Sequence, residues 1–210
     1  MSLATLSVFL PTFFLVSLTP GLCMTLALSL GMTVGVKRAA WMMIGELIGV
    51  GTVAVLSVIG VAGVLLQVPA LFTVFKWVGG AYLVWLGIEM WRSRGSLAIP
   101  EIAQDADQHA PAPPRGRLAL QGLVTAIANP KGWAFFIALL PPFLDFDAPL
   151  APQLVLLLSM ILSMETACLL LYATGGSAAR RLLEQQANVR LLNRIAGTLI
   201  MAVGLWLALG

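Results

Sequence analysis

The chain has 210 residues, of which 60% are apolar and 10% are charged, and its formal net charge is +3. A soluble domain has roughly 25% charged residues, so this composition excludes an ordinary soluble domain and indicates a single membrane domain with no separate soluble one. The basic residues are scattered among loops, which fits membrane orientation and argues against nucleic-acid binding.

Three apolar runs make up the first half, and each is long enough to cross a bilayer, which takes roughly 20 residues. The first run covers residues 3–36. No basic residue precedes it, so we interpret it as a first span rather than as a secretory signal. Because Thr19-Pro20-Gly21 interrupts this run, we predict a broken helix there. The second span covers about 39–66 and contains Glu46, and the third covers about 71–91.

Three further runs make up the second half. The fourth span covers 118–143, and Asn129-Pro130-Lys131 breaks it as the earlier proline motif breaks the first. The fifth span covers about 154–174 and is interrupted by Glu165, and the sixth covers about 195–209. A break inside hydrocarbon is tolerated only where it is buried in protein or lines a wet cavity.

Two longer polar segments lie between these runs. Residues 93–117 form a proline-containing linker, which we place on the cytoplasmic side between the halves. Residues 175–194 are polar and basic, and we interpret them as an interfacial amphipathic helix.

The two halves correspond in four positions, because the first and fourth spans carry a proline break and the second and fifth carry a lone glutamate. Three spans in each half give the halves opposite orientations. We therefore predict an all-α membrane protein in which residues 1–210 form one transporter domain. Its six transmembrane helices form two inverted three-helix repeats, about 1–92 and about 118–210, with helices 1 and 4 broken at proline.

Lysine and arginine predict the orientation. Ten of the twelve basic residues follow the first, third or fifth span, and they are Lys37, Arg38, Arg92, Arg94, Arg115, Arg117, Arg180, Arg181, Arg190 and Arg194. The face that carries them is expected to be cytoplasmic, which places both termini on the outside.

Ionisable groups inside the spans are the first candidates for function. Glu46, Lys131 and Glu165 would each cost at least about 2.5–3.5 kcal/mol to place at the bilayer centre, so they should face a cavity or one another. A structural ion pair between Lys131 and one glutamate is the alternative interpretation, and the two are compatible.

The breaks suit an amphiphilic zwitterion. Unpaired amides at the start of a half-helix attract a carboxylate, and freed carbonyls together with a glutamate suit an ammonium group. Neutral hydrogen bonds are available from Thr19, Thr25, Asn129 and Ser163. A carboxyl group in a low-dielectric site can also exchange a proton near neutral pH, so Glu46 or Glu165 could couple proton entry to solute exit.

The predicted substrate-binding residues come from both breaks and both glutamates. They are Thr19, Pro20, Gly21, Glu46, Asn129, Pro130, Lys131 and Glu165. The proton-coupling candidates are Glu46 and Glu165.

Neither a metal centre nor an enzyme is indicated. Cys23 and Cys168 are far apart, His109 is the only histidine, and no nucleophile–base set is visible, so we expect no resident metal, no cofactor and no catalysis. The cysteines are interpreted as small apolar filler or as cavity lining. Gly45 and Gly49, like Gly31 and Gly35, are four residues apart, which predicts close helix packing and permits a homodimer without requiring one.

Three segments together resemble the LysE/RhtB family of bacterial amino-acid exporters nearly end to end. The first is Thr19-Pro20-Gly21, and the second begins at Lys76 and continues as Gly79-Gly80-Ala81-Tyr82-Leu83-Val84-Trp85-Leu86-Gly87. The third is Asn129-Pro130-Lys131, followed by Phe135-Phe136 and Leu140-Pro141-Pro142-Phe143. The resemblance implies export of amino acids or close derivatives across the bacterial inner membrane, driven by the proton gradient.

One departure bears on the substrate. The family usually follows Pro-Gly with another proline and a polar residue, where this chain has Leu22 and Cys23. We therefore expect a neutral or hydrophobic amino acid rather than lysine or arginine, although the glutamates keep a cationic substrate open. Two other classes compete: an exporter of a metal or other small cation that uses the same glutamates, and a membrane enzyme or thiol carrier that uses the cysteines.

Overall fold

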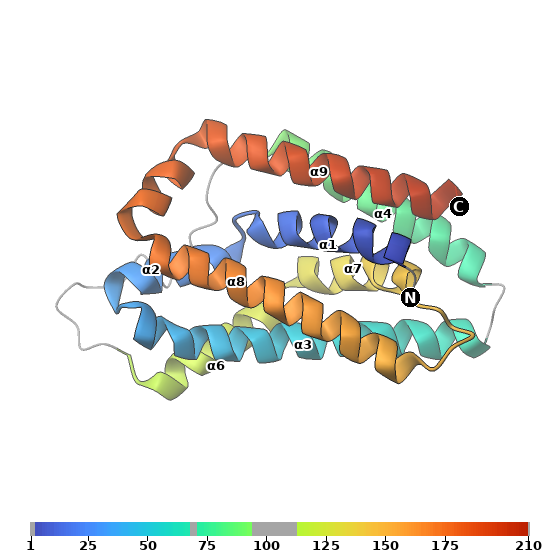
Figure 1. Ribbon diagram of the computed structural model, residues 1–210, viewed down its shortest axis with the longest axis horizontal. Helices are drawn as coiled ribbons and strands as arrows, with labels where there is room; N and C mark the ends of the chain where they lie inside the picture. Colours follow the sequence, from blue (N-terminus) through green and yellow to red (C-terminus); the bar gives the residue numbers. More distant parts are fainter. Residues whose placement is uncertain (1–2, 68–70, 94–112, 210) are drawn as a thin grey trace.

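The part of the chain that the structure describes is helical, with short connecting turns and no strand (Figure 1). This computed structural model describes residues 3–67, 71–93 and 113–209. Its elements in chain order are α1 (Leu3–Leu18), α2 (Leu22–Thr33), α3 (Val36–Gln67), α4 (Leu71–Arg92), α6 (Arg115–Ile127), α7 (Pro130–Leu139), the 3₁₀ turn η1 (Pro141–Phe143), α8 (Leu150–Glu184) and α9 (Gln186–Leu209).

Several of these helices can cross a bilayer. Among the described residues, segments of α3, α8 and α9 are long and apolar enough to do so alone. The pairs α1–α2 and α6–α7 pass the same test together, bent by 54° and 55° at their breaks, so up to five spans are found. The predicted third span is present as the helix α4, and its membrane crossing, like the six-span count, stays a prediction.

The two helix breaks lie where proline predicts them. Helix α1 ends at Leu18 and α2 begins at Leu22, on either side of Pro20. Helix α6 ends at Ile127 and α7 begins at Pro130, a position at which proline is tolerated because the first turn has no intrahelical acceptor for its amides. Each proline therefore interrupts a span without removing a hydrogen bond from the interior of a helix.

At each break, an aromatic side chain donates a hydrogen bond to one backbone carbonyl. The Tyr172 hydroxyl of α8 donates a hydrogen bond to the Leu18 carbonyl at 2.7 Å, and the Trp133 indole of α7 donates one to the Ile127 carbonyl at 2.8 Å. These bonds satisfy backbone groups that could not turn to water inside a membrane.

Close helix packing depends on glycine. A Cβ atom on Gly80 of α4 would lie 2.6 Å from the Gly204 carbonyl oxygen of α9, and one on Gly45 of α3 would lie 1.8 Å from the Ala119 carbonyl oxygen of α6. Small residues let helix backbones approach in this way inside membranes. The predicted close packing at Gly31, Gly45 and Gly49 is confirmed, and all three contact helices of the same chain. Gly35 differs, because it has a positive φ of 80° in the turn between α2 and α3, with no close neighbour.

The boundaries of one predicted element differ from the structure. Residues 175–194 are almost entirely helical, but they do not form a helix of their own, because α8 continues to Glu184 and α9 begins at Gln186. The segment of α8 that is long and apolar enough to cross a bilayer ends at Gly175, and the interfacial position of the residues after it stays a prediction.

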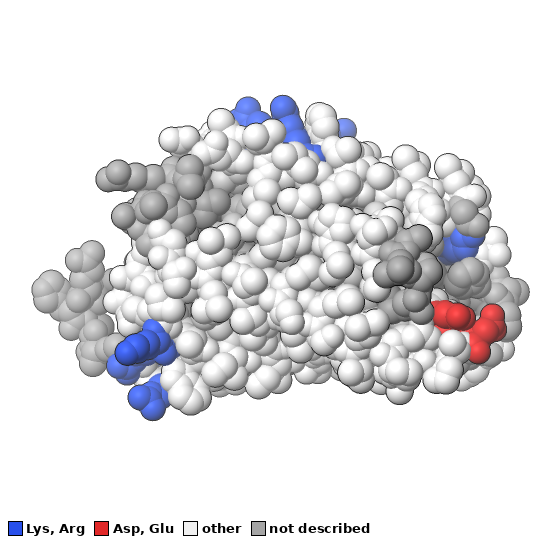
Figure 2. Space-filling model, viewed as in Figure 1, with Lys and Arg blue, Asp and Glu red and all other residues white. Residues whose placement is uncertain are grey.

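Charged side chains gather in a few places on the face in Figure 2. Blue side chains at one end of the long axis lie beside the α2–α3 turn and the start of α6, and others lie at the upper edge nearer the middle of that axis, by the start of α9. The red ones lie at the opposite end, by the turn before α8, which contains Asp145 and Asp147. Lys76, near the start of α4, is an exception to this separation. We call these the basic end and the acidic end.

Candidate functional site

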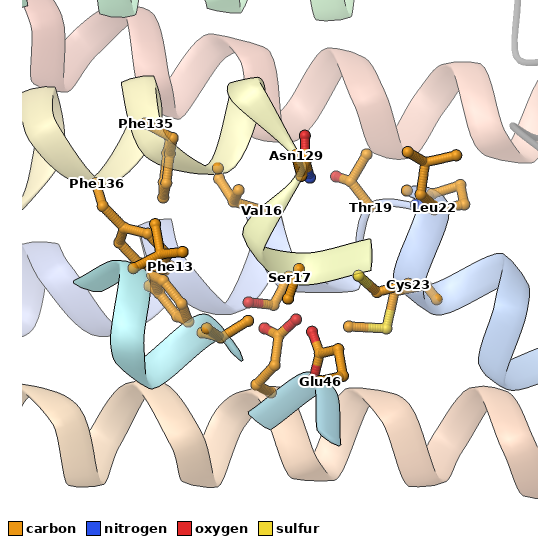
Figure 3. A pocket seen from close by; sticks show the side chains of 18 of the residues that line it. Phe13, Val16, Ser17, Thr19, Leu22, Cys23, Glu46, Asn129, Phe135 and Phe136 are labelled. Carbon is orange, nitrogen blue, oxygen red and sulfur yellow. The ribbon is translucent and has the colours of Figure 1, made fainter. Parts of the chain in front are cut away.

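A cavity of about 180 Å³ lies at the two helix breaks, lined by residues of both halves of the chain (Figure 3). A cavity needs about 10–15 Å³ to hold one water, so this one has room for several waters or a small solute. It lies between two groups of buried side chains, one containing the phenylalanines of α1 and α7 and the other packed around α2 and α8. Its polar lining residues are Ser17, Thr19, Cys23, Glu46, Asn129 and Glu165.

Two buried glutamates from different halves meet at this cavity. Glu46 of α3 is 0% exposed and Glu165 of α8 is 9% exposed, and their carboxyl groups interact electrostatically. Cys23 lies close to Glu46, but no atom of the described residues makes a hydrogen bond of acceptable geometry with either Glu46 oxygen. A buried carboxyl group without a partner is costly, so the site favours the arrival of a proton or a cation.

The close approach of α6 to α3 fixes the position of Glu46. A Cβ atom on Gly122 of α6 would lie 2.0 Å from the Met42 carbonyl oxygen and 2.8 Å from the Glu46 backbone nitrogen. Glu165 is approached from α1 instead, because the Ser17 hydroxyl lies within reach of its carboxyl group. Each glutamate is thus held by a helix of the opposite half.

The first turn of α2 faces the same cavity. Leu22, Cys23 and Met24 form this turn and line the cavity, and Gly21 supplies no side-chain cap. The first amides of a helix have no intrahelical acceptor, so this turn can receive a carboxylate.

Two backbone carbonyls at the breaks are less available to bind an ammonium group than the sequence predicts. Tyr172 and Trp133 already occupy the Leu18 and Ile127 carbonyls. The glutamates are therefore better placed than these two carbonyls to receive an ammonium group.

The predicted neutral donors divide into two groups. Thr19 and Asn129 line the cavity. Thr25 does not line the cavity. Its side chain is buried, and its hydroxyl donates to the Gly21 and Leu22 carbonyls at 2.8 and 3.1 Å. Ser163 is also misplaced by the sequence prediction, because its hydroxyl donates to the Ser159 carbonyl on an exposed face of α8.

A group of phenylalanines closes one side of the cavity. Phe13 of α1 and Phe135 and Phe136 of α7 line it and are buried. Figure 3 shows these three rings on one side of Glu46, with Leu22 and Cys23 on the other. Leu22 is 41% exposed, so the cavity is bordered by exposed chain at the break and by buried rings opposite.

Most of the predicted site residues share this one cavity. Thr19, Pro20, Gly21, Glu46, Asn129 and Glu165 all line it. The side chains of Pro130 and Lys131 lie outside the described residues, so the pairing predicted for Lys131 stays a prediction.

The sequence prediction missed the apolar lining and Ser17. Helical periodicity could have identified part of this lining. Ser17 and Phe13 lie three and seven residues before Pro20 and so share one face of α1. Of the cysteines, Cys23 lines the cavity, whereas Cys168 is buried among apolar side chains.

The site lacks the ligands of a transition-metal centre. Within the described ranges, no three His, Cys, Asp or Glu side chains come together as a metal-binding group. Two carboxyl groups alone fall short of the six or more oxygen ligands that a hard cation such as Ca²⁺ takes.

The family model described as "LysE type translocator" matches residues 14–210, nearly the whole chain. The chain belongs to this family. It is accordingly a membrane transporter, and the resemblance seen in the sequence motifs is confirmed. The match includes both helix breaks and both cavity glutamates.

Several curated proteins are similar to the chain over almost their full lengths. A homoserine/homoserine lactone efflux protein of Salmonella typhi is 30% identical over 200 residues, covering 95% of this chain and 94% of that protein. A leucine efflux protein of Klebsiella pneumoniae is 26% identical over 194 residues, covering 91% and 88%. An uncharacterized membrane protein of Vibrio cholerae is 29% identical, covering 91% and 90%. No solved structure is significantly similar to the chain.

Proposed function

We propose that the chain is a secondary transporter that exports amino acids or close derivatives from the cytoplasm by proton antiport. The observation that carries the proposal is the pair of buried carboxyl groups, Glu46 and Glu165, facing a cavity at two helix breaks. The names of the relatives, which are efflux proteins for homoserine, homoserine lactone and leucine, support the amino-acid class.

The cavity matches both ends of an amino acid. The ammonium group binds at Glu46 and Glu165, and the carboxylate binds at the first turn of α2, with Thr19 and Asn129 as neutral partners. Lys131 balances charge or meets the carboxylate. The lining also includes Val16, Val50, Val53 and several phenylalanines, which favours a neutral or hydrophobic amino acid.

The same glutamates couple transport to protons. Two carboxylates at close range in a low dielectric repel each other, so a proton or an ammonium group between them is favourable. Both ligands therefore compete for the Glu46–Glu165 pair. Proton binding from outside displaces the solute, and solute binding from inside displaces the proton, which is antiport.

Contacts between the halves support an inverted repeat at the level of whole spans. Helix α3 packs against α6 and α7, and α8 packs against α1 and α2, so each second span contacts the broken first span of the other half. The tightest contact of α3 is with the helix before the break, whereas that of α8 is with the helix after it, so the two contacts are not equivalent. The third spans, α4 and α9, pack on each other. Two repeats of residues 1–92 and 118–210, with 93–117 as the cytoplasmic linker and six spans in all, are part of the proposal.

We infer that the basic end faces the cytoplasm of a bacterial cell and that the protein lies in the inner membrane. Both termini lie toward the other end in Figure 1, which makes them periplasmic. The exposed break beside Leu22 then opens the cavity inward, while the phenylalanines close it outward. Gly31, Gly45 and Gly49 contact helices within the chain, so their spacing gives no support to the possible homodimer, which stays a prediction.

The test is efflux from preloaded cells that express the chain, measured for a panel of amino acids including homoserine and leucine. Accelerated efflux of one or a few of them, abolished by a protonophore, is expected. The same panel measured against cells without the protein corrects for endogenous exporters. If no member of the panel leaves the cells faster, the amino-acid proposal is wrong, and divalent and monovalent cations are measured next.

A further inference from the structure

We propose that Phe13, Phe135 and Phe136 form a side-chain subsite that sets which sizes of amino acid the cavity accepts. This inference rests on the proposed function and adds to it a second set of specificity residues, separate from the glutamates. We call these three rings the phenylalanine wall.

The wall joins the two halves of the chain. Phe13 of α1 stacks on Phe136 of α7, with ring centroids 6.2 Å apart and planes inclined by 24°, and it meets Phe135 at 6.3 Å. Phe135 and Phe136 meet edge to face at 5.8 Å. Aromatic rings at such distances attract one another, so the wall has a defined surface rather than a set of freely moving side chains.

The wall and the charged groups lie in different parts of the cavity. Figure 3 shows Phe13, Phe135 and Phe136 on one side of Glu46 and the first residues of α2 on the other. All amino acids share the ammonium and carboxylate groups, so the glutamates and α2 bind what they have in common. The variable side chain is left to the remaining lining, which is apolar on the side of the wall.

The rings are supported from behind by side chains that do not reach the cavity. Phe9 stacks on Phe13 at 5.6 Å and meets Phe143 at 5.1 Å, and neither Phe9 nor Phe143 lines the cavity. Shortening a wall ring therefore adds space to the cavity, whereas shortening Phe9 or Phe143 adds space only behind it. This difference supplies a matched control within one aromatic cluster.

The test compares two solutes that differ only in their side chains. Purified full-length protein in proteoliposomes is supplied with valine and phenylalanine together, and the ratio of their initial rates is measured. The variants are Phe136→Leu and Phe13→Leu, with Phe9→Leu and Phe143→Leu as controls. Because both solutes use the same protein molecules, the ratio does not depend on how much of a variant is folded.

Phe136→Leu and Phe13→Leu each remove three side-chain carbons, so we expect the phenylalanine-to-valine ratio to rise by at least about tenfold, the lower end of the effect of one methylene in an apolar pocket. The controls should keep the wild-type ratio. An unchanged ratio in both wall variants, or the same change in the controls, would overturn the subsite while leaving the transporter intact. Failure of the wild-type protein to transport any amino acid would overturn both proposals, and that outcome is seen before any variant is made.

Discussion

The contact between α3 and α6 at Gly122 should be essential for placing Glu46. A Cβ atom on Gly122 would lie 2.0 Å from the Met42 carbonyl oxygen, whereas ordinary contacts begin at 3.4 Å. The obstacle is backbone rather than a flexible side chain, so α6 must move away from α3 in Gly122→Ala. Forcing an extra methyl group into a packed interior costs about 1–3 kcal/mol. A displacement of about 1 Å next to a binding group can lower turnover by about 100-fold.

Gly116 of the same helix provides the control, because a Cβ atom there meets nothing within 4 Å. Alanine is favoured over glycine in a helix by up to about 1 kcal/mol, so Gly116→Ala should be neutral or slightly stabilising. Thermal unfolding of the purified variants and transport in proteoliposomes are the two assays. If Gly122→Ala unfolds and transports like the wild type, the account of how α6 positions Glu46 is wrong.

Three further predictions concern the breaks and the acidic end. Tyr172→Phe removes the hydroxyl that donates to the Leu18 carbonyl and should lower the free energy of unfolding by about 0.5–1.5 kcal/mol, since one partly buried hydrogen bond is lost. Tyr82→Phe, which keeps its ring contact with Trp85, is the control, and equal stability of the two variants would refute the role of this bond. Gln153→Ala removes the amide that donates to the Asp145 carbonyl and accepts from the Asp145 backbone N–H, so it should lower stability by about 1–3 kcal/mol and leave substrate selectivity unchanged. Altered selectivity would contradict the observation that Gln153 and Asp145 do not line the cavity. Leu22→Cys in a Cys23→Ala background should react with a charged thiol reagent in inside-out vesicles and not in right-side-out vesicles, because Leu22 is 41% exposed at the break and Cys168 is buried; labelling only from the opposite face would reverse the proposed orientation.

The helix breaks could be predicted because their cause is local. Pro20 and Pro130 lack an amide hydrogen and stand beside Gly21 and Asn129, residues that favour turns over helix. Pro11 also lacks the hydrogen but lies inside α1, so the combination with a neighbouring turn residue, rather than proline alone, predicts the ends of α1 and α6. The sequence could also predict that Glu46 and Glu165 meet at one cavity, because each occupies the corresponding position in its half of the chain. Whether the pair binds substrate stays a prediction.

What the sequence could not provide depends on how distant helices pack. The wall of Phe13 and Phe136 joins residues more than 100 positions apart, and the bond from Tyr172 to Leu18 joins α8 to α1. Apolar residues are found on every face of these helices, so a hydrophobic pattern does not tell which ring faces a cavity and which faces lipid. The boundaries of the helix predicted over 175–194 were missed because a polar segment can continue the helix of the preceding span, as α8 does to Glu184.

The measurement that tests the central claim most directly is proton-driven transport by Glu46→Gln in proteoliposomes. Glutamine keeps the shape of the side chain but cannot take up and release a proton. Glu89→Gln, at an exposed glutamate near the end of α4, is the control. An imposed proton gradient should accelerate transport by the wild type and by Glu89→Gln and leave Glu46→Gln at its rate without a gradient. Full gradient-driven transport by Glu46→Gln would contradict the account and remove Glu46 from proton coupling.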